Sequence, residues 1–70
     1  MKNTFKYQIG QIIQYESYYN SSLFMLITES FTSADGNNAY TIKYLDDGDI
    51  QQMSEDLIAI KESRSDYVIL

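Results

Sequence analysis

The sequence predicts an all-β fold, a small barrel of five or six antiparallel strands with one 3₁₀ turn. Apolar and polar side chains alternate over several short stretches, as they do in half-buried strands. Two tight-turn dipeptides, Asp35-Gly36 and Asp47-Gly48, separate three of these stretches. Folding the stretches back at these turns brings their apolar side chains onto one face. The 70 residues suffice for a single domain, residues 1–70, with its core over about residues 5–60.

The first predicted strand runs from Phe5 to Tyr15. Apolar and polar residues alternate up to Ile9, and Gly10 then interrupts the pattern, which indicates a bend or bulge within the strand. A polar loop is expected over residues 16–22. The longest strand is expected over residues 23–31, apolar in its first half and alternating in its second.

A third strand is expected over residues 40–45, after a two-residue turn centred on Asp35-Gly36. This register sets Phe31 opposite Tyr40 and leaves Glu29 as the one charge on an otherwise apolar face. The far end of this hairpin is apolar on both faces, which suits a sheet that curls into a barrel.

A fourth strand is expected over residues 50–53, after a second two-residue turn centred on Asp47-Gly48. A three-residue turn with a left-handed Gly48 would separate two carboxylates, but it would mismatch the apolar pairs. The two-residue turn pairs Leu45 with Ile50, Ile42 with Met53 and, unfavourably, Asp46 with Asp49.

The segment from Ser54 to Leu57 is predicted to form one helical or 3₁₀ turn, with Ser54 as its cap and acidic residues at its positive end. A strand then resumes over residues 57–60. A full helix over residues 54–64 is the weaker alternative. Residues 66–70 end in an uncharged apolar run and are expected to add an extra strand at the barrel's own edge. The alternatives are pairing across a subunit boundary or capture by another protein's sheet edge.

The charge balance restricts the classes of partner. Ten Asp and Glu residues against five Lys and Arg residues give a net charge of −5, which disfavours binding to phosphate backbones and anionic lipid. We expect no direct nucleic-acid binding and no membrane contact, but a protein partner with a basic surface. No apolar run is long enough to span a membrane, and no secretion-signal pattern is present, so a cytoplasmic location is the expectation.

Catalysis is not expected. The chain has no His and no Cys, so neither a Ser–His pair nor a thiolate nucleophile is available. The glycines are too far apart for a phosphate loop. A calcium loop around Gly48 fails because Ser54 stands where a bidentate Glu is required. No cofactor and no metal are expected.

Three segments resemble the SH3-like barrels of the Tudor and KOW type. Residues 7–13 resemble the glycine-containing opening of these domains, residues 40–49 their third strand and following turn, and residues 53–58 the short turn before the last strand. The resemblance spans roughly residues 5–60 and implies a small barrel.

Tudor domains bind methylated Lys or Arg in an aromatic cage. The resemblance implies that Tyr44 is the third-strand aromatic of such a cage and that Asp49 is its polar residue after the turn glycine. Tyr15, Tyr18 or Tyr19 would supply the aromatic near the first loop. The chain departs from the family at Asp47, where an aromatic often stands. Alternatively, these tyrosines serve only packing.

The predicted function is a non-catalytic protein-interaction module that binds a basic peptide or protein surface through an aromatic and acidic groove. One alternative is an acidic inhibitor of the viral type, as in phage or prophage proteins, that mimics nucleic acid on a DNA- or RNA-binding protein. Another is a structural subunit, such as a homodimer, that assembles through residues 66–70. The candidate binding residues are Tyr15, Tyr18, Tyr19, Tyr44, Asp46, Asp47 and Asp49.

Overall fold

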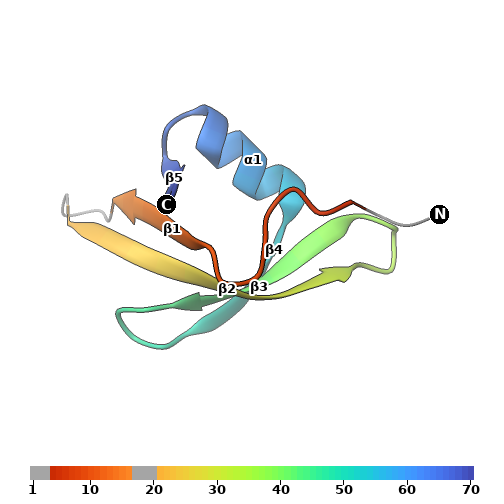
Figure 1. Cartoon of the computed structure of the whole chain (residues 1–70), viewed down its shortest axis with the longest axis horizontal. Coiled ribbons are helices and arrows are strands. Elements are labelled where there is room, and N and C mark those ends of the chain that lie inside the picture. Colours follow the sequence, from red (N-terminus) through yellow and green to blue (C-terminus); the bar gives the residue numbers. More distant parts are fainter. Residues whose placement is uncertain (1–3, 17–20) are drawn as a thin grey trace.

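The computed structural model describes residues 4–16 and 21–70, which form one antiparallel sheet and one helix (Figure 1). The spatial strand order is β4-β3-β2-β1-β5. This arrangement confirms a mostly β domain with five antiparallel strands. The elements are β1 (Ile12–Glu16), β2 (Ser22–Thr32), β3 (Asn38–Tyr44), β4 (Ile50–Ser54), α1 (Glu55–Ser63) and β5 (Tyr67–Ile69).

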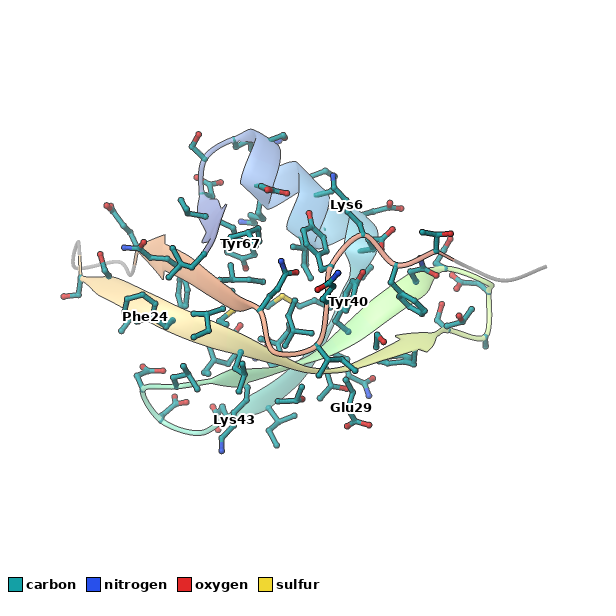
Figure 2. All side chains as sticks on the ribbon, viewed as in Figure 1. Lys6, Phe24, Glu29, Tyr40, Lys43 and Tyr67 are labelled. Carbon is teal, nitrogen blue, oxygen red and sulfur yellow. The ribbon has the colours of Figure 1, made fainter. Side chains whose placement is uncertain are left out.

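The core lies between the sheet and α1. Figure 2 shows Tyr40 and Tyr67 on the helix side of the sheet, the inner face, and Glu29 and Lys43 on the opposite, outer face. Side chains alternate between the two faces along each strand. The inner face and α1 bury one apolar cluster: Tyr7, Ile13, Met25, Ile27, Tyr40, Ile42, Met53 and Ile58.

The first strand is shorter than the sequence predicts, because β1 begins only at Ile12. The expected bend at Gly10 is present, with φ +95°, and the Gly10 N–H donates to the Ile27 carbonyl at 2.8 Å. Residues 4–9 are not a strand. The backbone of this segment forms hydrogen bonds with side chains instead. For example, the Tyr7 N–H donates to the Tyr40 hydroxyl at 3.0 Å.

The register predicted between the second and third strands is wrong. Ser30, not Phe31, lies opposite Tyr40, and the register shifts between Ile27 and Glu29. This bulge moves Glu29 and Phe31 to the outer face. A regular strand would have pointed the Glu29 carboxylate into the core, so the bulge removes the one charge from the apolar face.

The register predicted for the next hairpin is also wrong, by two residues. Lys43 lies opposite Ile50 and Tyr40 opposite Met53, because the turn is longer than two residues. The Gly48 N–H donates to the Tyr44 carbonyl at 2.8 Å, and the Tyr44 N–H donates to the Asp49 carbonyl at 2.8 Å. Asp46 therefore lies within the turn and not opposite Asp49, which avoids the like-charge pair.

A nine-residue helix, α1, replaces the expected single turn and the strand over residues 57–60. The predicted cap is confirmed, since the Ser54 hydroxyl accepts a hydrogen bond from the Leu57 N–H at 3.1 Å. Ile58 is the buried residue of the helix. Ile60, which favoured a strand in the sequence pattern, is 49% exposed.

The C-terminal strand pairs with β1 of the same chain, with Tyr67 opposite Tyr15 and Ile69 opposite Ile13. It is therefore the fifth strand of the sheet and not an additional sixth one. The Tyr67 hydroxyl lies 4.0 Å from the Met53 sulfur. Side chains of the two outermost strands, β4 and β5, therefore meet over the inner face.

Within the described residues, no helix has both the length and the apolar character that a membrane span requires.

Candidate functional site

Two of the predicted binding residues, Tyr15 and Tyr44, are brought together on the inner face. Their ring centroids lie 6.0 Å apart with an interplanar angle of 77°, an edge-to-face contact. They come from β1 and β3, on either side of β2, where Met25 lies opposite both Ile13 and Tyr44. The two rings therefore meet across the intervening strand.

A third ring, Tyr67, joins this pair and was missed in the sequence. Its centroid lies 6.1 Å from that of Tyr15, at an interplanar angle of 66°. The sequence marks Tyr67 only as part of a strand, because its cross-strand pairing with Tyr15 depends on a register that the sequence does not specify. We call Tyr15, Tyr44 and Tyr67 the tyrosine triad. All three side chains are partly buried.

The turn after β3 places its carboxylates beside the triad. Burial is the main cause of the raised pKa of Tyr44, and the charges of Asp47, Asp46 and Asp49 raise it further. Burial also raises the pKa of Tyr15, followed by the charge of Asp46. All three carboxylate residues are exposed. The site therefore combines neutral phenol rings with a negative turn.

The turn holds its own geometry with an internal hydrogen bond. Asp47 Oδ1 accepts from the Asp49 N–H at 2.9 Å, an Asx-type contact that local side chains often make. The Tyr44 hydroxyl donates to Gln51 Oε1 at 3.3 Å, which links the triad to β4. These contacts position the acidic turn relative to the rings.

A groove of about 530 Å³ runs along two rings of the triad, Tyr15 and Tyr67, between β1, β5 and the segment that joins α1 to β5. Its charged lining consists of the carboxylates of Glu16 and Asp66 and the amine of Lys61 on α1, so carboxylates predominate here as well. The remaining lining residues are Gln14, Ser65 and Val68.

Two further predicted site residues, Tyr18 and Tyr19, lie outside the described part of the chain. Within residues 4–16 and 21–70, no three His, Cys, Asp or Glu side chains are grouped as metal ligands.

A second polar cluster, centred on Glu55, holds the N-terminal segment against α1. Glu55 Oε2 accepts from the Tyr40 hydroxyl at 2.6 Å and from the Lys6 N–H at 2.8 Å. The Tyr7 hydroxyl donates to Glu62 Oε1 at 2.7 Å. The sequence marks Glu55 only as an acid at a helix start, so this role was missed.

The Glu55 cluster shifts the pKa values of its members. Burial raises the pKa of Glu55, but hydrogen bonds from Tyr40, the Lys6 backbone and Asn38 outweigh this effect, and the net shift is downward. Burial and the hydrogen bond to Glu55 raise the pKa of Tyr40 to about 12. The lowered pKa keeps Glu55 ionised as an acceptor, and the raised pKa keeps Tyr40 protonated as a donor. Both groups therefore have a structural role.

Comparisons of the chain with protein-family models, with curated proteins and with solved structures find no match.

Proposed function

We propose that this chain is a non-catalytic protein-interaction domain that binds a basic peptide or a basic protein surface at the tyrosine triad. The observation that carries the proposal is the contact of Tyr15 with both Tyr44 and Tyr67, beside the carboxylates of the β3–β4 turn. Ring faces attract cations and pack against the methylene stems of Lys and Arg. The turn carboxylates would accept hydrogen bonds from the charged heads.

The groove supports this proposal, because it provides room for a peptide beside two of the rings. Its Glu16 and Asp66 carboxylates extend the negative potential from the turn along β1 and β5. A peptide with several basic residues would therefore meet carboxylates at more than one point, and charge complementarity would accelerate its association.

We also propose that the fold is a small SH3-like barrel. Two observations support this: the contact of the Tyr67 hydroxyl with the Met53 sulfur, which links side chains of the two outermost strands over the inner face, and the helical segment between the fourth and fifth strands. This helical segment lies where the resemblance to SH3-like barrels predicts a short turn before the last strand.

The test is a double variant, Tyr44→Leu with Asp47→Asn, measured for binding to a pool of Lys- and Arg-rich peptides by fluorescence polarisation. Leu retains apolar bulk without a ring, and Asn retains the oxygen that accepts from the Asp49 N–H. We expect at least tenfold weaker binding. Unchanged binding would discard the site.

The matched control is Glu29→Gln, which removes one carboxylate from the outer face and should leave the affinity within twofold. If the control weakens binding as much as the double variant, and high salt abolishes both, diffuse acidity is responsible. That result would favour an acidic mimic of nucleic acid over a peptide-binding groove.

A further inference from the structure

β4 is an end strand of the sheet and most of it is uncovered. It occupies one end of the strand order that the described residues form, and four of its five residues are exposed, all except Met53. Ile50 is 66% exposed, although apolar side chains of this size are usually buried. This edge is a surface that the tyrosine triad does not use.

The register of β4 fixes which backbone groups face outward. The Tyr44 N–H donates to the Asp49 carbonyl, and the pairing then continues without a shift through Ile42 opposite Gln51. Hydrogen-bonded pairs alternate in an antiparallel ladder. Gln51 and Met53 therefore bond to β3, while Ile50 and Gln52 direct their N–H and carbonyl groups toward the open edge.

β4 lacks the devices that usually prevent an edge from pairing. Its sequence, Ile50–Ser54, contains no charge and no proline, and its pairing with β3 has no bulge. Natural edge strands commonly carry lysine, proline or a bulge against unwanted pairing. The carboxylates lie at the two ends instead, with Asp49 before the strand and Glu55 and Asp56 after it.

A hollow of about 200 Å³ lies on the outer face beside this edge. Ala39 forms its floor, because this small residue stands between Phe31 and Ser54 in a row across three strands. Gln52 of β4 and the carboxylate residue Asp35 also line it. A strand added to β4 would direct every second side chain over the outer face, where one of them can enter the hollow.

We propose that β4 is the docking edge for an extended segment of a partner protein, which adds to the sheet as a further strand. The segment has about five uncharged residues, with branched apolar side chains at alternate positions, flanked by Lys or Arg. Its cations would face Asp49 at one end of β4 and Asp56 or Asp35 at the other. The backbone bonds provide affinity, and the hollow and the flanking carboxylates provide specificity.

Charge favours such a partner over a second copy of this chain. Two copies paired antiparallel about Gln52 would set Asp49 of each opposite Glu55 of the other, because these residues are equally distant from Gln52 in the sequence. Like charges opposite each other in a sheet are destabilising, and each copy carries a net charge of −5. A basic segment would avoid both the facing carboxylates and the repulsion between two chains of negative net charge.

The probe is a nine-residue peptide, Lys-Lys-Val-Thr-Val-Thr-Val-Lys-Lys, titrated into the full chain and followed by amide chemical shifts. We expect the largest shifts at Ile50 and Gln52. Two N-methylated forms test the mode of binding, one methylated at the three Val amides and one at the two Thr amides. An added strand uses only alternate amides, so one form should bind at least tenfold more weakly and the other within threefold.

Three results of this titration would overturn the proposal: no binding of the probe, equal affinity of both methylated forms, or shifts centred on Tyr15, Tyr44 and Tyr67. The last result would assign the peptide to the triad. A chain that sediments as a dimer, and loses this state with Gln52→Pro, would instead show a second copy at this edge.

Two protein variants complete the test. Gln52→Pro removes an outward N–H without removing a bond to β3 and should weaken binding at least tenfold, whereas Gln52→Thr, which retains the N–H, should not. Should Gln52→Pro fail to fold, Ala39→Val decides independently. It partly fills the hollow, and an affinity equal to that of the parent chain would contradict the proposed seating of a side chain there.

Discussion

The Tyr40 hydroxyl donates a 2.6 Å hydrogen bond to Glu55 Oε2, which joins the middle of β3 to the first turn of α1. The same hydroxyl accepts from the Tyr7 N–H at 3.0 Å, so one phenol connects strand, helix and N-terminal segment. The Phe5 and Tyr7 rings pack edge to face on Tyr40, with centroids at 5.9 and 5.6 Å. Polar and aromatic contacts therefore converge on one buried side chain.

Tyr40→Phe should reduce the free energy of unfolding by about 1–3 kcal/mol, because it leaves the buried Tyr7 N–H without its acceptor and removes one of the donors to Glu55. Urea denaturation followed by circular dichroism measures this change. The control is Tyr44→Phe, whose hydroxyl donates only to the exposed Gln51 at 3.3 Å. A loss no larger than that of the control would mean that the Tyr40 hydroxyl does not hold these elements together.

Acid should destabilise the fold through Glu55. Its folded-state pKa is lowered from 4.5, so its contribution to stability is complete above the unfolded pKa and is lost as the pH falls through the folded one. Urea midpoints measured from pH 7 to pH 3 should decrease below about pH 4.5. Glu55→Gln should flatten this dependence relative to Asp56→Asn. Equal pH slopes for the two variants would exclude Glu55 as the cause.

Alkali should destabilise the fold through the two buried phenols. Burial raises the pKa of Tyr40 from 10.0 to about 12, and that of Tyr7 also lies above its usual value. A raised folded pKa means that stability is complete below pH 10 and is lost as the pH rises through the folded pKa. Absorbance at 295 nm should show late-titrating tyrosines in the native chain, which include Tyr7 and Tyr40 as well as the triad, because burial also raises the pKa values of the triad. Tyr7→Phe should remove one of them, and an unchanged titration would contradict this assignment.

The strands could be predicted from the sequence because their signals are local. Observed strands or turns contain the apolar residues from Ile12 to Tyr15, the apolar run from Leu23 and the glycine turns. The alternation from Phe5 to Ile9 is also a local signal, but it does not form a strand. The buried residues Met25, Ile27 and Ile42 follow from the apolar pattern of the second and third predicted strands. Ser54 likewise caps a helix through a contact with a near neighbour.

The features that could not be predicted depend on residues distant in the sequence. A bulge after Ile27 is favourable only because Glu29 would otherwise enter a core closed by α1. The helix forms at residues 55–63 because Ile58 has a core to enter, whereas the local pattern fits a strand equally well. Tyr67 belongs to the candidate site only through its pairing with Tyr15.

The end of α1 offers a stabilising substitution. Ser65 has φ +63°, and the Ser65 and Asp66 N–H groups donate to the Glu62 and Lys61 carbonyls at 3.0 and 2.9 Å. This is a Schellman C-cap, in which glycine is usual because a left-handed conformation strains other residues. Ser65→Gly should raise the free energy of unfolding by up to about 1 kcal/mol, less the extra entropy of an unfolded glycine. Ser65→Val should lower it, because a β-branched residue fits this conformation poorly. Thermal unfolding of the three chains should rank them Gly, Ser, Val, and a Val variant as stable as the parent would contradict the strained cap.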